Sequence, residues 1–337
     1  RFMSEGMAFA IPPERTTVEQ EWGGAMGAGH DPRWKQGLHH DTGRSWDLED
    51  VRDFYVGQLF GLDPHLLRYV DAERALDLGR ATVAELMART LSEWRRPGST
   101  CRGGLLVALR DLAPGAGWGV VDAGGRPKAP WFTLKRALAP VAVLVTDEGL
   151  NGLHLSVVND TAHEVAGRLT LALYARGEML IEEAARTVAV PARGQVTVEA
   201  GAMLEGFRDV SYAYRYGPAP YDVVAVALED GAGVPVSEVV HLPAGLDRAT
   251  EPDVGLEARA QAGGDGGWSL AVSTRRLAQW VVVEVPGYRA ADSWFHLAPG
   301  ATRTVALVPG AGAGDGPPAG RVRCLNAERA ARVVVDR

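Results

Sequence analysis

The pattern of hydrophobic and polar residues changes character near residue 140. Up to that point, apolar residues recur at steps of three and four, which indicates amphipathic helices. Asp47 is a suitable cap for a first helix, whose predicted apolar face comprises Leu48, Val51, Phe54, Tyr55 and Leu59. A second helix ends before Pro97, and its predicted apolar face comprises Leu76, Val83, Met87, Leu91 and Trp94.

An apolar run over Gly104–Leu109 follows these helices. Its lack of alternation predicts a strand that is buried on both faces. A glycine-rich loop over Gly115–Gly119 comes next, and a last helix is predicted over Trp131–Leu138. Helices that alternate with wholly apolar strands indicate an α/β fold with a parallel sheet.

After Pro140, short strands separated by turn residues predict β-sandwiches. The first set of predicted strands comprises Val141–Val145, Leu153–Val158, Arg168–Tyr174, Leu180–Val190, Val196–Glu199, Val223–Leu228 and Val234–His241. A linker over Pro243–Pro252 leads to a second set, which comprises Val254–Ala260, Trp268–Ser273, Trp280–Val285, Thr302–Val308, Gly320–Leu325 and Arg332–Asp336. At about 100 residues each, the two sets fit a pair of sandwiches.

The composition excludes several classes of partner. Of the 337 residues, 46% are hydrophobic and 23% are charged, a balance typical of folded domains. The 35 basic and 42 acidic residues give a net charge of -7 without a basic cluster, so we expect no nucleic-acid partner and no membrane partner. No apolar run reaches the ~18–20 residues that a membrane-spanning helix needs.

The cysteine usage bears on the compartment. Cys101 and Cys324 are the only cysteines and lie in different predicted domains, so we expect no disulfide framework. This favours a reducing compartment such as the cytoplasm. The first residues, Arg1–Glu14, lack the charged and apolar regions of a signal peptide and read like the middle of a domain, so the localisation stays open.

Three segments carry a resemblance to a known family. Residues 1–6 read RFMSEG, and residues 101–143 read CRGGLLVALRDLAPGAGWGVVDAGGRPKAPWFTLKRALAPVAV. The tail contains LAVSTRRLAQWVVVEVPG, DSWFHLAPG and RVRCLNA. These segments resemble the β-mannosidase-like branch of glycoside hydrolase family 2. Together they extend over nearly the whole chain, and the middle segment is the most specific.

The chain departs from the family pattern in the same segments. Gly6 stands where the family usually has Phe, and Arg110 replaces the Asn of a Leu-Asn-Asp triplet. Ala108 and Ala113 stand where Trp is typical. Loss of an aromatic side chain from the eighth barrel strand would alter the wall of the sugar site. These departures therefore bear on the mannose preference more than on the fold.

The resemblance implies a multidomain chain. Residues 1–139 would form the last two βα units of a (β/α)8 TIM barrel, followed by immunoglobulin-like β-sandwiches over residues 140–245 and 246–337. A complete barrel takes ~250 residues. The resemblance therefore also implies a partner segment, the remainder of the barrel, upstream of this chain.

The resemblance gives Glu5 the role of catalytic nucleophile. Retaining glycosidases use two carboxylic groups about 5–5.5 Å apart, one as nucleophile and the other as acid and then base. In the family, the nucleophile is the Glu of a Ser-Glu pair at the end of the seventh strand, and an Asn-Glu pair supplies the acid/base. None of the three asparagines precedes a Glu, so we expect the chain alone to be inactive. Without the resemblance, Glu5 is an ordinary solvated residue near a terminus.

Trp118 and Asp122 are further candidates for contacts with the sugar. The resemblance places them in the loop after the eighth strand, and simple packing explains them equally well. The implied chemistry needs no cofactor and no metal. The run His39-His40-Asp41 is a weak metal candidate, because adjacent histidines rarely bind one ion.

The implied function is retaining hydrolysis of terminal β-mannosides in a β-linked oligosaccharide or glycoside substrate. Two alternatives stay open. One is a family relative that acts on β-galactosides, glucuronides or glucosaminides, because the eighth-strand aromatic residues are altered. The other is a non-catalytic carbohydrate-binding or scaffolding module, because the predicted sandwiches occupy most of the chain.

Overall fold

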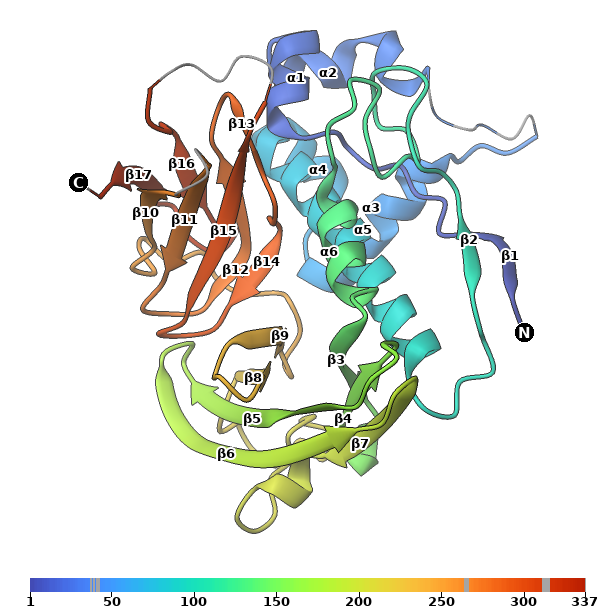
Figure 1. Cartoon of the computed structure of the whole chain (residues 1–337). Coiled ribbons are helices and arrows are strands. Elements are labelled where there is room, and N and C mark those ends of the chain that lie inside the picture. The colour runs from blue at the N-terminus through green and yellow to red at the C-terminus, as the bar shows by residue number, and fades with distance from the viewer. Residues whose placement is uncertain (37, 39, 41–42, 264–266, 311–315, 337) are drawn as a thin grey trace. The chain divides into compact units, whose positions relative to one another are not determined.

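A computed structural model describes residues 1–36, 38, 40, 43–263, 267–310 and 316–336 (Figure 1). The chain forms two compact units. The first comprises Arg1–Ala139 with Gly245–Asp247, and the second comprises Pro140–Ala244 with Arg248–Arg337. The finer division into three domains stays a prediction. None of the helices in the described part of the chain combines the length and the hydrophobicity of a membrane-spanning segment.

The first unit is mainly helical and contains one short parallel strand pair. Strands β1 (Met3–Gly6) and β2 (Gly104–Leu106) pair in parallel, as the sequence indicated. The helices are α1 (Arg15–Trp22), α2 (Ala25–His30), α3 (Leu48–Phe60), α4 (Pro64–Val70), α5 (Ala72–Arg95) and α6 (Ala129–Ala137), with a 3-10 turn at Pro32–Lys35. The predicted cap of α3 is confirmed, because the Asp47 side chain accepts a hydrogen bond from the Glu49 amide at 2.8 Å.

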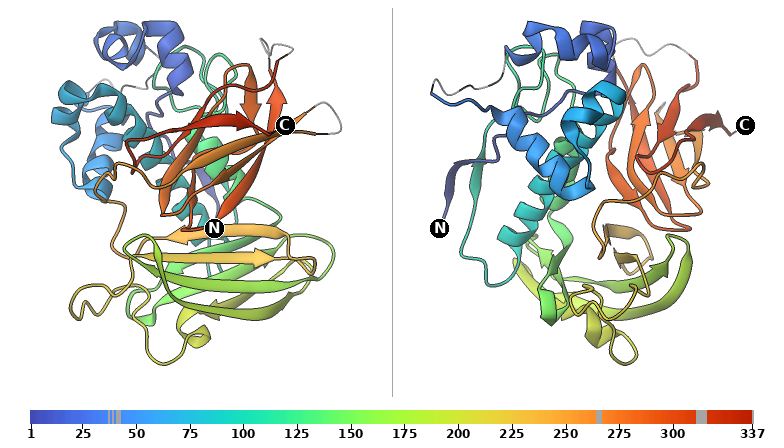
Figure 2. Two further views of the ribbon diagram at one scale, coloured as in Figure 1. Left: turned by 90° about the vertical axis from the view of Figure 1, so that its left-hand side faces the viewer. Right: turned by 180° about the vertical axis from the view of Figure 1, so that it is seen from behind.

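Helices α5 and α6 lie side by side and form the centre of this unit (Figures 1 and 2). Val83, Met87 and Leu91 of α5 pack with Leu134 of α6 in one buried cluster. These α5 residues recur at steps of four, so the predicted apolar face is confirmed. The Thr133 hydroxyl of α6 also donates a hydrogen bond to the carbonyl of Ala84 at 3.1 Å.

The predicted apolar face of α3 is confirmed only in part, because Leu48, Val51, Tyr55 and Leu59 are half-buried while Phe54 is exposed and charged residues occupy several of the most buried positions. Glu49, Arg52 and Asp53 are at most 4% exposed, whereas Phe54 is 62% exposed. The buried positions do follow the helical period, but charged residues occupy several of them. Burial is tolerated because the charges pair with one another: Arg52 lies 3.1 Å from a Glu49 carboxylate oxygen and 2.7 Å from one of Asp53.

The prediction of a doubly buried strand over Gly104–Leu109 is wrong. Strand β2 ends at Leu106, and the side chains of Leu105 and Leu109 are exposed. Among the described residues, β1 is the only strand that pairs with β2, so no second neighbour covers this run. An apolar sequence is typical of a strand that is buried on both faces, but the elements that bury it must come from other parts of the protein.

In the second unit, the residues up to His241 form two antiparallel sheets around one core. The three-stranded sheet has the order β3-β4-β7, and the four-stranded sheet has the order β6-β5-β8-β9. The strands are β3 (Val141–Asp147), β4 (Leu153–Asn159), β5 (Val165–Ala175), β6 (Met179–Val190), β7 (Gly194–Glu199), β8 (Val223–Glu229) and β9 (Pro235–His241). All seven overlap the predicted strands. The long curved strands β5 and β6 are seen from two more sides in Figure 2.

Alternation in β5 explains why this region folds as strands. Leu169, Leu171 and Leu173 are fully buried in the core between the two sheets. Arg168 faces solvent, as expected for an antiparallel strand with one wet face. The other sheet contributes Leu155 and Val157 of β4 to the same core.

Asn159 illustrates how a turn residue closes this region. Its side-chain oxygen accepts a hydrogen bond from the Thr161 amide at 3.0 Å, and its amide group donates to the carbonyls of His163, Val190 and Pro191. Asn159 is fully buried. Although Asn159-Asp160-Thr161 matches a glycosylation sequon, this Asn forms an Asx turn.

The remaining residues form a second all-β region with its own core. Its strands are β10 (Glu257–Ala262), β11 (Trp268–Ser273), β12 (Ala278–Glu284), β13 (Tyr288–Ala290), β14 (Phe295–Leu297), β15 (Thr302–Pro309), β16 (Arg321–Arg323) and β17 (Ala331–Val335). They are hydrogen-bonded in the order β13-β15-β11-β10-β17-β16-β12-β14. The short strands β13 and β14 were not predicted. Strand β17 pairs in parallel with β10 and antiparallel with β16, and so links the two halves of this order.

Candidate active site

Glu5 lies on β1, beside the strand that leads into the glycine-rich loop. The Met3 amide donates to the Gly103 carbonyl at 3.0 Å, and the Val107 amide donates to the Gly6 carbonyl at 3.3 Å. The Glu5 side chain is exposed. The parallel pairing therefore brings Glu5 and the end of β2 to the same, carboxyl-terminal edge of the strand pair.

The chain that follows β2 is bonded directly to the segment around Trp118. The Ala108 amide donates to the Trp118 carbonyl, and the Val120 amide donates to the Ala108 carbonyl, each at 3.1 Å. The Trp118 side chain is half-buried. Val107 bonds to Gly6 on one side, and Ala108 bonds to Trp118 on the other. The backbone that continues β2 therefore lies between the Glu5 segment and the Trp118 segment.

Asp122 is held inside the first unit. It is 2% exposed, and its carboxylate accepts hydrogen bonds from the Thr17 hydroxyl at 2.6 Å and the Arg126 amide at 2.8 Å. Each carboxylate oxygen of Asp122 thus accepts a hydrogen bond from within the first unit. Together the two bonds join α1 to the turn over residues 122–126. This anchoring fixes the loop that carries Trp118, and a direct contact of Asp122 with a sugar stays a prediction.

Sequence reasoning missed a buried ion pair in the same loop. Lys128 Nζ lies 2.5 Å from Asp111 Oδ2 and also donates to the carbonyls of Ile11 and Gly117. Burial lowers the pKa of the Lys128 ammonium and raises the pKa of the Asp111 carboxyl, although each partner's charge opposes that change. Both residues fall in the segment that carries the family resemblance. The residues of that segment indicated the family. Nothing in their spacing indicated that Lys128 and Asp111 would pair.

Two glycines allow the loop to fold over Asp111. The Gly119 amide donates to Asp111 Oδ1 at 2.7 Å. A Cβ atom on Gly119 would lie 2.5 Å from the Asp111 backbone nitrogen, and one on Gly117 would lie 2.4 Å from Asp111 Oδ1. Gly115–Gly119 is therefore a packing loop, and among the described residues no helix begins directly after it as in a phosphate-binding loop.

A second buried charge cluster surrounds the start of α3. The indole nitrogen of Trp34 donates to Glu49 Oε1 at 2.9 Å, and Arg52 pairs with the same carboxylate. Burial raises the pKa of Glu49, but Arg52, the Trp34 hydrogen bond, Arg68 and Lys35 outweigh it and lower the pKa to about 2. Trp34 is thus a core residue.

The weak metal candidate cannot be followed, because His39 and Asp41 lie outside the described residues. Within the described part of the chain, no group of three or more His, Cys, Asp and Glu side chains is placed to hold a metal ion. Cys101 and Cys324 are both free thiols.

The chain is similar to known mannosidases in one domain and over longer stretches of sequence. The Ig-fold domain family of mannosidases (Ig_mannosidase) matches residues 251–327. β-Mannosidase B of Neosartorya fischeri is 26% identical over 269 residues, which cover 73% of this chain and 30% of that protein. β-Mannosidase B of Thermothelomyces thermophilus is 44% identical over 55 residues, 16% of this chain and 6% of the relative. The chain spans less than a third of the length of these relatives.

Solved structures give a likeness of fold. A β-D-mannosidase from Dictyoglomus thermophilum has a TM-score of 0.68 at 15% identity, over 91% of this chain and 35% of the other. An exo-chitosanase from Amycolatopsis orientalis has a TM-score of 0.64 at 16% identity, over 97% and 42%. The resemblance to β-mannosidase-like proteins of glycoside hydrolase family 2 is thus confirmed, and the matches are consistent with a C-terminal portion.

Proposed function

We propose that this chain is the C-terminal part of a retaining exo-glycosidase that removes terminal β-mannosides. The observation that carries the proposal is the position of Glu5. It lies exposed at the carboxyl-terminal edge of β1, and β1 pairs in parallel with the strand that leads to Trp118. The similarity to β-mannosidase B over 73% of the chain supports the same assignment.

In the proposed reaction, a Glu5 carboxylate oxygen attacks the anomeric carbon. The bond to the leaving oxygen breaks as a second carboxylic acid donates a proton to that oxygen. Water then attacks the glycosyl-enzyme, and the second carboxylate accepts its proton, which releases the sugar and restores Glu5. The second carboxylic acid would come from the part of the protein upstream of Arg1.

We further propose that β1 and β2 are the last two strands of a (β/α)8 barrel. The exposed apolar side chains of Phe2, Leu105, Leu109 and Leu112 support this. Isolated edge strands with apolar faces pair readily with further strands. The occupant of this surface would be the remainder of the barrel from the same polypeptide.

The test of this function uses the complete enzyme and an aryl β-mannoside. Glu5→Gln keeps the size of the side chain but removes the attacking charge, so kcat should fall by several orders of magnitude with unchanged folding. Glu21→Gln, a change of an exposed carboxylate on α1, is the matched control and should keep full activity. Near-normal turnover by Glu5→Gln would show that Glu5 is not the nucleophile.

A glucosaminide is the second candidate substrate. Ala108 and Ala113 replace tryptophans that are typical of the β-mannosidase pattern, and the fold is similar to that of an exo-chitosanase. The ratio of kcat/KM for aryl β-mannoside and aryl β-glucosaminide decides between the two. A ratio above unity supports the mannosidase, and a ratio below unity supports the alternative.

A further inference from the structure

A pocket opens at one end of the β3–β9 region of the second unit. Its volume is about 210 Å³, and it lies between the 3-10 turn η2 (Gly149–Asn151), the end of β7 and the loop 204–222. Pockets for drug-sized ligands have volumes of about 300–1,000 Å³. This pocket therefore fits a single small ring.

Three exposed aromatic side chains gather in the same loop. The rings of Tyr214 and Tyr216 are stacked, with centroids 6.0 Å apart, and Phe207 meets Tyr214 edge to face at 5.4 Å. Phe207 and Tyr214 also line the pocket. Stacked rings that face solvent form a flat apolar platform, which the core does not require.

The loop is held in place by side chains bonded to the backbone. The Asp209 carboxylate accepts hydrogen bonds from the amides of Ala213 and Tyr214 at 2.9 and 2.8 Å. The Ser211 hydroxyl donates to the Gly149 carbonyl at 2.8 Å, and the Tyr214 hydroxyl donates to the Leu150 carbonyl at 3.3 Å. The aromatic platform is therefore pre-organised, which reduces the entropy lost on binding.

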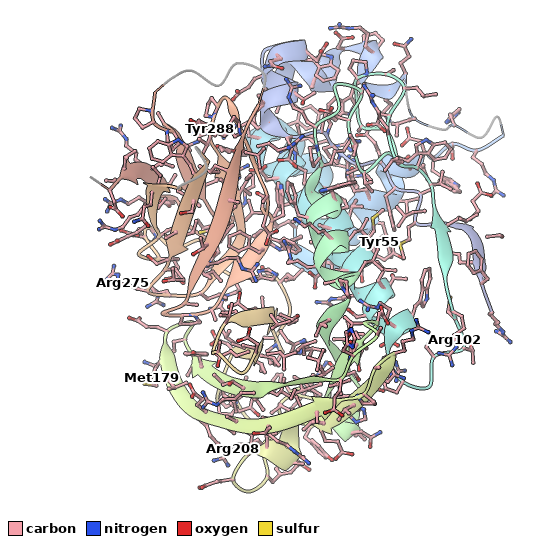
Figure 3. All side chains as sticks on the ribbon, in the orientation of Figure 1. Tyr55, Arg102, Met179, Arg208, Arg275 and Tyr288 are labelled. Carbon is pink, nitrogen blue, oxygen red and sulfur yellow. The ribbon has the colours of Figure 1, made fainter. Side chains whose placement is uncertain are left out.

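The charges around the pocket limit the chemistry of a ligand. Arg208 is already bound to the Glu182 carboxylate at 2.9 Å and lies beside β6 (Figure 3). In the described part of the chain, the Glu199 carboxylate and the Asn151 side-chain amide, which line the pocket, have no partner. The available groups are thus a negatively charged hydrogen-bond acceptor and a side-chain amide, and the negative charge of Glu199 disfavours phosphates and other anions.

We propose that this pocket is a second carbohydrate-binding site, which holds one ring of a β-linked oligosaccharide. A pyranose has an apolar C–H face that packs on an aromatic ring and equatorial hydroxyls that donate to a carboxylate. Tyr214, which lines the pocket, and Tyr216, which stacks on Tyr214 beside it, supply the platform. Glu199 and Asn151 supply the polar contacts. The site is independent of the catalytic role proposed for Glu5.

The experiment titrates the 337-residue chain with β-1,4-mannotetraose and cellotetraose, using saturation-transfer NMR and calorimetry. Tyr216→Ala should weaken binding about tenfold, by analogy with the loss of an aromatic side chain that stacks on a nucleic-acid base. Glu199→Gln should weaken it as well. The controls are Tyr69→Ala and Glu164→Gln: Tyr69 is 80% exposed against 82% for Tyr216, and Glu164 is an exposed carboxylate at the other end of the same sheets.

Binding that is weakened by Tyr216→Ala and by Glu199→Gln and unchanged in both controls supports the site. Absence of binding by the unaltered chain overturns it, and so does equal binding by all variants. Glu5→Gln is measured alongside and should bind normally. A failure of the second site is thus distinguishable from a failure of the proposed catalysis, which is read from turnover of the complete enzyme. Thermal unfolding followed by circular dichroism checks that each variant is folded.

Discussion

Lys128 Nζ lies 2.5 Å from Asp111 Oδ2, and neither side chain is more than 6% exposed. Lys128 also donates to the Ile11 carbonyl, in the segment that follows β1. One buried ammonium group thus ties the segment after β1 to the loop after β2. The two strands that carry the proposed nucleophile and the Trp118 loop are fixed by this contact.

Replacing Lys128 should destabilise the first unit strongly. Lys128→Met leaves the buried Asp111 carboxylate without its partner, which typically costs about 3–5 kcal/mol. Arg89→Met is the control, because Arg89 is more than half-exposed in its pair with Glu85 and such pairs contribute about 0–1 kcal/mol. The free energy of unfolding of both variants is measured by urea denaturation, with hydrogen exchange of the α5 amides as the probe. Equal losses in the two variants would contradict the role of the buried pair.

Glu49 should make the first unit sensitive to acid. Its pKa is lowered from 4.5 to about 2 in the folded chain, so the folded state favours the ionised carboxylate. This stabilisation, about 3 kcal/mol, is present above pH 4.5 and is lost as the pH falls toward 2. The unfolding free energy of the parent chain should therefore fall more steeply across this window than that of Glu49→Gln. Parallel curves would show that Glu49 does not carry the effect.

The two cysteines should differ sharply in reactivity. Burial raises the pKa of the Cys324 thiol to about 12, whereas Cys101 is partly exposed. Because the thiolate is the reactive form, a maleimide at about pH 8 should modify Cys101 and leave Cys324 intact until urea is added. Peptide mass spectrometry assigns the modified residue. Rapid modification of Cys324 in the folded chain would contradict its burial.

The exposed apolar surface of β2 should cause self-association of the isolated chain. Leu105→Lys places a charge on the strand and should lower the fraction of oligomer in analytical ultracentrifugation. Leu180→Lys on β6 is matched in exposure, 51% against 57%, and should have no effect. If both variants associate like the parent chain, β2 is not the surface through which the chain self-associates.

The antiparallel strands were the part of the fold most accessible to sequence reasoning. In β5, Leu169, Leu171 and Leu173 lie on the core face at a period of two, with Arg168 and Thr170 on the other face, so the period is visible. Strands β13 and β14 were missed because each has three residues, too few to display a period.

The charged contacts were the part that the sequence did not reveal. Arg52 and Glu49 occupy buried helical positions that a hydrophobicity pattern scores as surface. Lys128 and Asp111 meet across a loop, and their pairing depends on the glycines that let the backbone close over the carboxylate. The roles of Glu5 and Trp118 came from a family resemblance, because an exposed Glu on a short strand has no signal of its own.

The most direct test of the central claim is covalent labelling of the complete enzyme with a mechanism-based 2-fluoro mannoside. A glycosyl-enzyme on Glu5 predicts that the label resides on the peptide containing Ser4-Glu5-Gly6 and is absent from the Glu5→Gln variant. The mass of the labelled peptide and its fragmentation identify the carboxylate. A label on any other carboxylate, or an unlabelled enzyme that still hydrolyses the aryl β-mannoside, would contradict the assignment of Glu5.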